Sequence, residues 1–584
     1  MSAFNCCSSL ECRTMKFLLN HLSVVCMAVL IGAVSLVLAD VGSSVLTSKH
    51  NLSSSGPGPI KVAGETEVCK FCHTPHASNP IAPLWNREDP GTYYQTYKSS
   101  TLVASVGQPT GSSRLCLSCH DGTIALTQTY NPRNSPSGSI YISSQDRGYI
   151  GTDLSDDHPI SFVYNSSLVA KKGQLASPNS LPKELVLDHE GRLQCTTCHD
   201  PHNNQYGMFL TMNNAESLMC RTCHIMDGWA ASTHAKSSAG LSGSAHGQWD
   251  NIRASTVRQA ACEACHRPHT AGGRERLLRY EAEEDNCLSC HDGSVADKNI
   301  ASQMTRLSAH PVTFATGVHD PTEDYRSMSK HVECVDCHNP HQTRSGSTAV
   351  APFIKASMTG ISGSSGSGGY IPEASYEFQV CYKCHAGAGS TVRNPLVDRV
   401  FINTDVADEF SPNNPSFHPI EVRGKNSDVP SLSQDFRTTS IIYCTDCHGS
   451  DSSQVLGPHG SMYRPLLVRQ YAIGDNTPES PAAYALCYGC HDRSVILNKR
   501  RSFKEHQRHL VDEDVPCSAC HDPHGISASQ ASGANSGTHL INFDRRIATA
   551  STAAGTGPSF VDRGRRRGSC TLLCHDRDHD DERY

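Results

Sequence analysis

The sequence predicts a chain of mostly irregular coil with short α-helices and very little β-sheet, whose interior is not filled by aliphatic side chains. Hydrophobic residues make up only 37% and aromatic residues 6% of the 584 residues, which is too little for several conventional apolar cores. Alternating apolar runs are also scarce. In contrast, the chain contains 28 Cys and 32 His, so we expect these residues to hold whatever fills the interior.

The N-terminus has the features of an export signal. Lys16 precedes an apolar run over 22–38, and Ala39 ends a small-residue cleavage site, so residues 1–39 are the expected signal peptide. Met15 is an alternative start. The other interpretation is an uncleaved membrane anchor, because the run is close to the shortest length that spans a bilayer. No later segment is long and apolar enough to do so, and the net charge of −7 gives no reason to expect nucleic-acid binding.

Cysteine spacing carries the main signal. Four cysteines precede residue 40, and the other 24 form twelve pairs, each followed at once by His. Eleven pairs have the spacing CxxCH, and the last one is CTLLCH, with one extra residue. The paired cysteines are Cys69 and Cys72, Cys116 and Cys119, Cys195 and Cys198, Cys220 and Cys223, Cys262 and Cys265, Cys287 and Cys290, Cys334 and Cys337, Cys381 and Cys384, Cys444 and Cys447, Cys487 and Cys490, Cys517 and Cys520, and Cys570 and Cys574.

CxxCH is the attachment motif of haem c, because two thioether bonds fix the macrocycle to a short loop and the next His binds the iron. Structural zinc sites combine Cys pairs in fours or with spaced His, and a disulfide framework gives no reason for the His. The sequence therefore predicts about twelve covalent haems in a haem-cored fold, with short helices at the attachment motifs. The expected proximal ligands are His73, His120, His199, His224, His266, His291, His338, His385, His448, His491, His521 and His575.

Histidine is also the expected second axial ligand. Nineteen His remain outside the motifs and the signal, against eight Met, which favours bis-His ligation and low potentials. Five motifs continue as CHxPH, and three residues are too short to reach the opposite face of the same iron, so each trailing His should bind a neighbouring haem. Together with GPHG and three His-Pro-apolar segments, these motifs indicate His76, His158, His202, His269, His310, His341, His418, His459 and His524 as distal ligands.

A repeat orders these histidines: CxxCH, an interposed His, then a second CxxCH with a trailing His. It occurs five times, and three positions stay open. The second copy offers His234 or His246, the fifth His506 or His509, and the last haem His539 or His579. We expect His50, His189, His319 and His331 not to be ligands.

The motifs leave about 45 residues per haem, too few for a domain around each one. The haems should therefore pack against one another as a quasi-linear array. The Gly/Ser-rich segment 359–369 is the expected linker between residues 40–358, with haems 1–7, and residues 370–584, with haems 8–12.

The CHxPH motifs, the HPISF and HPVTF segments and the terminal CTLLCH resemble the doubled-CxxCH multihaem cytochromes of metal-respiring bacteria. The likeness spans nearly all of 60–580. It implies electron transfer across the periplasm or at the outer surface of a Gram-negative bacterium, toward extracellular acceptors such as metal oxides. Other redox cytochromes and a porin conduit are the implied partners. Some members of this family polymerise into filaments, and the spacings do not show whether this chain forms oligomers or filaments.

Closely packed bis-His haems have no open coordination position, so the expected function is electron transfer without a catalytic residue. The alternative is a multihaem oxidoreductase, such as a reductase of nitrogen or sulfur oxyanions. That chemistry needs one five-coordinate iron, and all twelve motifs end in His.

Overall fold

The computed structural model describes residues 44–131, 135–241, 254–313, 331–346, 348–387, 396–531, 533 and 535–584. The expected signal peptide, His246 and His319 lie outside this part of the chain. Contacts divide the chain into two compact units, of which the first is Met1–Ile225 with Pro268–Thr270 and the second is Met226–Arg267 with Ala271–Tyr584.

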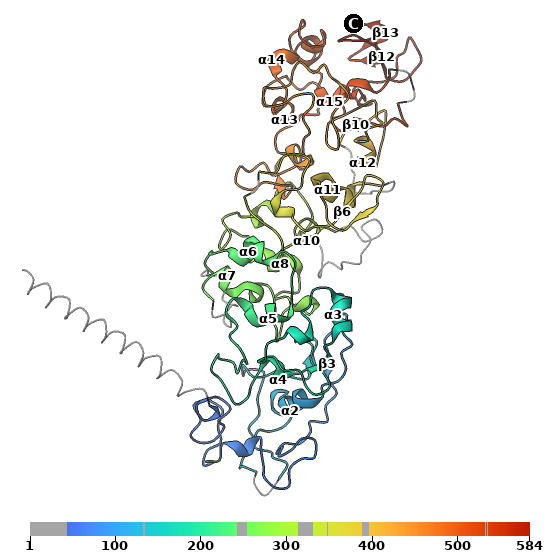
Figure 1. Ribbon diagram of the computed structural model, residues 1–584. Helices are drawn as coiled ribbons and strands as arrows, with labels where there is room; N and C mark the ends of the chain where they lie inside the picture. The colour runs from blue at the N-terminus through green and yellow to red at the C-terminus, as the bar shows by residue number, and fades with distance from the viewer. Residues whose placement is uncertain are drawn as a thin grey trace, which may run out of the picture. The chain divides into compact units, whose positions relative to one another are not determined.

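Short elements joined by irregular chain build both units (Figure 1). The first unit contains helices α2 (Gly111–His120), α3 (Ser166–Lys172), α4 (Cys195–Cys198) and α5 (Leu218–Cys223), and strands β1 (Gln95–Thr96), β2 (Asp153–Leu154), β3 (Phe162–Val163) and β4 (Arg192–Leu193). The helices of the second unit are α6 (Thr233–Lys236), α7 (Val257–Ala260), α8 (Glu283–Leu288), α9 (Ala301–Met304), α10 (Cys334–Cys337), α11 (Glu377–His385), α12 (Val406–Glu409), α13 (Ala485–Tyr488), α14 (Arg493–Ile496) and α15 (Cys517–Cys520). Its strands are β5 (Ser308–Ala309), β6 (Gly363–Ser364), β7 (Tyr370–Ile371), β8 (Ser416–Phe417), β9 (Gly460–Ser461), β10 (Gly525–Ile526), β11 (Ser559–Asp562), β12 (Gly568–Cys574) and β13 (Arg577–Arg583).

Most attachment motifs form one helical turn. Helices α4, α10 and α15 run from the first to the second Cys of a motif, and three other motifs begin in the 3₁₀ turns Cys69–Phe71, Ala261–Ala264 and Cys444–Asp446. Residues three apart lie on the same side of a helix, so one turn presents both sulfurs to one edge of a macrocycle. The expected fold class of short helices, coil and little sheet is confirmed.

Two short ladders join an interposed His to a trailing His that lies far along the chain. In the pair β5–β9, Ala309 lies opposite Gly460, and in β8–β10, Phe417 lies opposite Gly525. A Cβ atom on Gly460 would lie 1.8 Å from a backbone oxygen, and one on Gly525 would lie 2.1 Å from another. These oxygens belong to Gln303 and Glu409, so glycine after the trailing His permits the close approach of the backbone at those two residues.

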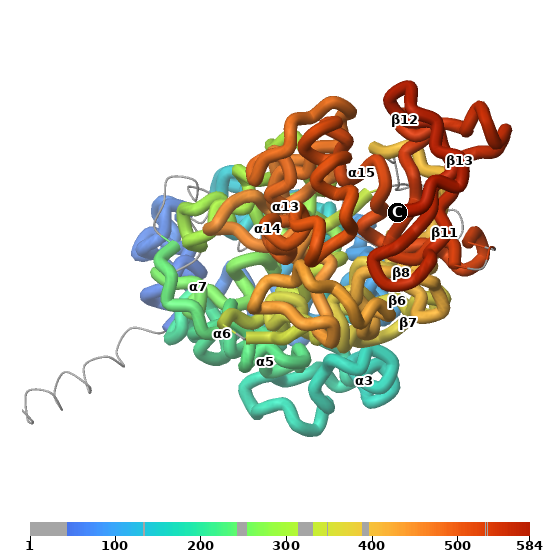
Figure 2. The backbone as a smooth tube through the Cα atoms, turned by 90° about the horizontal axis from the view of Figure 1, so that it is seen from above, coloured from blue at the N-terminus to red at the C-terminus, as the bar shows by residue number. Residues whose placement is uncertain are grey.

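The last motif is an exception to the expected helix. Cys570 and Cys574 lie on β12, the central strand of the antiparallel sheet β11–β12–β13, whose strands run side by side in Figure 2. Three residues, Thr-Leu-Leu, separate these cysteines, so a single helical turn of the CxxC kind does not fit the spacing. The strand pairs on both sides and satisfies its backbone there instead.

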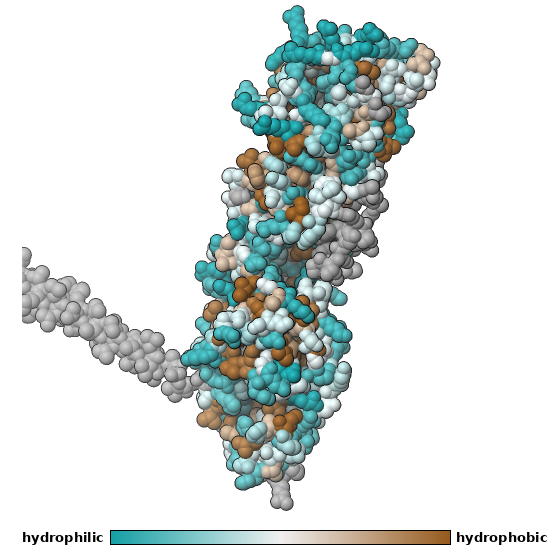
Figure 3. All heavy atoms as spheres, turned by 45° about the vertical axis from the view of Figure 1, so that its right-hand side comes forward, coloured by the Kyte–Doolittle hydropathy of each residue, from teal (hydrophilic) through white to brown (hydrophobic). Residues whose placement is uncertain are grey.

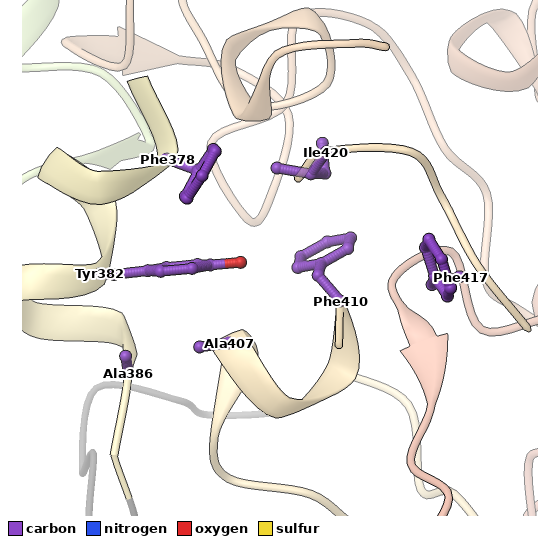
Figure 4. Close-up of a cluster of buried hydrophobic side chains, with 7 residues drawn as sticks. All are labelled: Phe378, Tyr382, Ala386, Ala407, Phe410, Phe417 and Ile420. Atoms are coloured by element: carbon purple, nitrogen blue, oxygen red, sulfur yellow. The ribbon is translucent and has the colours of Figure 1, made fainter. Parts of the chain in front are cut away.

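Apolar side chains form several small clusters in place of one large core. One cluster joins α11, α12 and the chain around β8 and consists of Phe378, Tyr382, Ala386, Ala407, Phe410, Phe417 and Ile420 (Figure 4). On the face shown in Figure 3, apolar residues gather in small groups between polar ones. Within the described ranges, no helix has the length and apolar character needed to cross a bilayer.

The segment 359–369, the expected linker, lies inside the second unit. Strands β6 and β7 pair there as an antiparallel hairpin, and both Ile361 and Ser364 are buried. The Gly and Ser residues of this segment allow a tight turn rather than a flexible connection. The division into compact units falls near residue 225 instead.

Candidate haem-binding sites

Most proximal histidines face a second histidine at a recurring distance. Nine pairs of rings have centroids between 5.9 and 6.3 Å apart. With metal–nitrogen bonds of about 2 Å, two imidazoles on opposite faces of one iron have centroids about 6 Å apart. The residues therefore fit bis-His haem at these sites. The pairs, proximal His first, are His73–His202, His120–His50, His199–His269, His224–His158, His266–His341, His291–His234, His338–His459, His448–His524 and His521–His506.

Two more proximal histidines lie near an expected distal ligand. Burial lowers the pKa of His385 to about 4, with a further contribution from nearby His310. Burial likewise lowers the pKa of His491 to about 4, and nearby His418 adds to the effect. A low pKa keeps the imidazole neutral, which is the form that binds a metal.

The second ring nitrogen of several proximal histidines is held by the backbone. Nδ1 of His199 donates to the Met208 carbonyl, and Nδ1 of His266 donates to the Arg276 carbonyl, both at 2.9 Å. These bonds leave Nε2 for iron. Met208 and Arg276 have φ values of 51° and 56°, and such left-handed conformations persist only where the surrounding structure imposes them. The loop after the motif thus orients the ring at the expense of local strain.

The proline of a trailing CHxPH or GPHG motif anchors the distal histidine of another site. In each case a ring Nδ1 donates to the carbonyl of that proline, and a metal-bound His ordinarily has such a partner. The proline therefore links the trailing His of one site to the distal His of its neighbour. The bonds are His50 to Pro201 (3.1 Å), His234 to Pro340 (2.9 Å), His310 to Pro458 (2.8 Å) and His418 to Pro523.

Two trailing histidines have a carboxylate in place of a carbonyl. Nδ1 of His269 lies 2.9 Å from Asp157 Oδ1, and Nδ1 of His524 lies 2.8 Å from Glu409 Oε2. Burial lowers the pKa of His269, but the hydrogen bond to Asp157 and the nearby negative charges together outweigh it, so the pKa is raised. A carboxylate partner makes a bound imidazole a stronger donor to the iron, which stabilises ferric over ferrous haem.

Substituting Asp157→Asn is therefore expected to raise the reduction potential of the haem bound by His199 and His269. We expect at least a tenfold change in that oxidation equilibrium, about 59 mV for one electron. Potentiometric titration of the loaded protein, followed by absorbance, measures the shift. Asp146→Asn is the control, because that exposed carboxylate contacts Ser143 at the surface. An unchanged or lowered potential for Asp157→Asn contradicts the prediction.

The structure places His50, and not His76, close to another histidine ring. The His50 ring lies 6.2 Å from that of His120 and stacks on Phe209 at 4.0 Å. The His76 side chain is exposed, and no other histidine ring of the described chain lies against it. A signal for His50 existed in the sequence: it precedes the first motif as His158 precedes the third, so it occupies the interposed position of an additional, incomplete repeat.

The site of Cys570 and Cys574 fits a haem less well. Nε2 of His575 faces the Asp475 carboxylate at 2.9 Å, and its φ is +48°. Of the candidate distal ligands, His539 uses its carbonyl to hold His521 and directs its ring at Asp562. The ring of His579 donates to or accepts from the Tyr584 hydroxyl, and His509 lies against the same tyrosine. No histidine ring stands about 6 Å from His575 in the part of the chain that the structure describes.

Consecutive motifs meet through their cysteines. The described motif cysteines form no disulfide. In four places the first Cys of one motif is within hydrogen-bonding reach of the first Cys of the next: Cys116–Cys195, Cys287–Cys334, Cys381–Cys444 and Cys487–Cys517. If these sulfurs carry thioether bonds, the two attached macrocycle edges would be adjacent.

Repeated CxxCH turns, paired imidazoles spaced for one iron and a chain of little regular structure together define a multihaem c-type cytochrome. Residues 189–227 and 255–296 match the doubled CXXCH motif family, and residues 443–522 match the cytochrome c554 and c-prime family. The multiheme cytochrome MtrA of Shewanella baltica (strain OS185) is 26% identical to the chain over 208 residues. That match covers 33% of this chain and 42% of MtrA, so it spans less than half of the curated relative.

Proposed function

We propose that this chain carries electrons through about twelve covalently bound haems, most of them closed by two histidines. The observation that carries the proposal is the set of nine ring pairs at 5.9–6.3 Å. Haem c, when bound, supplies the one-electron Fe(III)/Fe(II) chemistry. The paired imidazoles occupy both axial positions, so they favour electron exchange over substrate binding.

The proposed ligand assignment follows the ring pairs, with His310 added for His385 and His418 for His491. It places His50 in the ligand set and leaves His76 outside it. For the site of His575, the distal ligand is one of His509, His539 and His579, or that position is open. The attachment cysteines are the twelve pairs of the sequence motifs.

Adjacent attachment points support transfer between haems within the chain. Cys116 and Cys195 illustrate the arrangement: α2 and α4 hold the two sulfurs close together, and both cysteines are half-buried. Electrons then pass between neighbouring macrocycle edges without crossing a protein layer. Repetition of this contact in both units supports a conduit along the chain.

We place this conduit in the periplasm or at the outer surface of a Gram-negative bacterium. The expected signal peptide and the partial likeness to MtrA support that location. The electron partners would be other cytochromes, with or without a porin, and the acceptors would be extracellular, such as metal oxides. Self-association into oligomers or filaments would extend the same conduit.

A multihaem oxidoreductase with one open haem is the second candidate. The site at His575 favours it, because Nε2 of this histidine faces Asp475 and no paired ring stands at the iron distance among the described residues. An open iron there would bind a small oxyanion or similar ligand. The remaining sites would still deliver electrons to it.

Low-temperature EPR of the oxidised, fully matured protein separates these functions. We expect low-spin ferric signals only, with a pyridine haemochrome assay giving about twelve haems per chain. A high-spin signal equal to about one haem would favour the oxidoreductase. Absence of haem from protein made in a host with c-type maturation would overturn both.

A further inference from the structure

The Arg87 side chain is completely buried in the first unit. Its Nη1 donates to the carbonyls of Leu126 and Gln128, both at 2.9 Å, and its Nη2 donates to the Ser118 carbonyl at 2.8 Å. Ser118 lies inside the motif Cys116–Cys119. The guanidinium is therefore fixed against the loop that attaches the second haem.

The chain at Arg87 also adjoins the first haem site. The backbone N–H of Asn86, the residue before Arg87, donates to the Cys72 carbonyl at 2.9 Å, and Asn86 Nδ2 donates to the Lys70 carbonyl at 2.6 Å. Both carbonyls belong to the first attachment motif. The chain at Arg87 thus contacts the first two motifs, through Asn86 and through the guanidinium.

Arg87 has no carboxylate within ion-pairing distance in the described chain, and its Nε is buried without a hydrogen-bond partner. Asp121, a carboxylate close to Cys119, is already hydrogen-bonded: it accepts from the Tyr94 hydroxyl at 2.7 Å and from Thr123. A buried cation without a counter-ion is costly unless negative charge lies nearby. Two haem propionates, and the electron that an iron gains on reduction, are negative charges of that kind.

Arg399 is a second buried arginine, in the second unit. It makes similar hydrogen bonds to an attachment loop, but a carboxylate neutralises its charge. Nη1 of Arg399 donates to the Ser518 carbonyl at 2.6 Å, and Nη2 donates to the His521 carbonyl at 2.8 Å, both in the motif of Cys517 and Cys520. Its Nε, however, lies 3.6 Å from Oδ2 of buried Asp522. Among the described residues, Arg87 thus holds an attachment loop without a carboxylate partner, and Arg399 holds one while paired with a carboxylate.

We propose that Arg87 sets the reduction potentials of the first two haems, acting as a buried positive charge without a carboxylate partner that makes them the most easily reduced haems of the first unit. The inference rests on the proposed function, because it requires haem at both motifs. Arg87 is a positioning residue: it touches the attachment loop and acts on the irons through its charge. Electrons entering this unit would accumulate at these two haems.

Arg87→Gln tests the proposal in the loaded protein. We expect at least one component of the potentiometric titration to move to lower potential by tenfold or more in its equilibrium constant, about 59 mV for one electron. Arg87→Lys retains the charge and should remain close to the wild type. Haem content and low-spin EPR signals should stay unchanged in both variants, which separates a charge effect from lost ligation.

Ser118→Asp is the second test, in case Arg87→Gln does not mature. Asp336 occupies the equivalent position of the Cys334–Cys337 motif, where it is buried and Lys383 donates to its carbonyl. A carboxylate at residue 118 should neutralise Arg87 and lower the same potentials while leaving the arginine in place.

The double variant Arg399→Gln with Asp522→Asn removes a net-neutral pair and should change the potentials little. If the titrations of Arg87→Gln and Ser118→Asp both superimpose on that of the wild type at full haem content, the inference is overturned and the proposed function stands. If neither variant nor wild type contains haem, the proposed function itself fails.

Discussion

Replacing His50 with alanine is expected to convert one low-spin haem into a high-spin haem. The His50 ring is 6.2 Å from that of His120, and its Nδ1 is held by the Pro201 carbonyl. Without this imidazole, the iron bound by His120 loses its sixth ligand. Low-temperature EPR should show a high-spin ferric signal equal to about one haem, and carbon monoxide should bind to one reduced haem per chain.

His76→Ala is the matched control for this experiment. His76 has the CHxPH setting of a distal ligand, but its side chain is exposed and faces no other histidine ring among the described residues. Its loss should leave the EPR spectrum and carbon monoxide binding unchanged. The reverse result, in which His76→Ala opens an iron and His50→Ala does not, would restore the assignment that the motif alone suggests.

The polypeptide made without c-type maturation is expected not to fold. Its apolar clusters are small: the one around Tyr382 has seven buried members. Without haem, the burial of apolar surface in such small clusters cannot offset the loss of chain entropy.

Circular dichroism and thermal unfolding compare the fold of the haem-free chain with that of the matured protein. The haem-free chain should show a coil-like far-ultraviolet spectrum and no cooperative transition, whereas the matured protein should unfold cooperatively. A variant with Cys195→Ser and Cys198→Ser, which removes one attachment site, should fall between them and contain one haem fewer. A cooperative transition in the haem-free chain would contradict the expectation that haem forms the core.

The short spacing of Cys and His in the attachment motifs explains which features of the protein could be predicted from its sequence. Two thioether bonds and one iron–imidazole bond require Cys, Cys and His within five residues, so the attachment motifs and the coil-rich fold class follow from neighbours in the chain. The same reasoning predicts that trailing histidines, such as His202 and His269, bind a neighbouring haem, because a short connection forbids ligation of the same iron.

Partner choice required the tertiary structure, because each distal histidine meets an iron site many residues away. The β5–β9 and β8–β10 ladders, and the bonds from His310 and His418 to distant proline carbonyls, decide these pairings. A pattern of residue types does not encode which two segments form such a ladder.

Residue type and short-range covalent geometry thus determined the class of protein and its attachment residues. Contacts between distant segments decided which histidine rings lie together, whereas local strand pairing placed the last motif on a strand and formed the hairpin of β6 and β7. The roles of Arg87 and Arg399 also depend on the tertiary structure. Nothing in the sequence marks either residue. The structure shows that both are buried and that Arg399 has a carboxylate neighbour. The physical reason is that bond lengths act between adjacent residues, whereas axial ligation and local electrostatics depend on segments that the fold alone brings together.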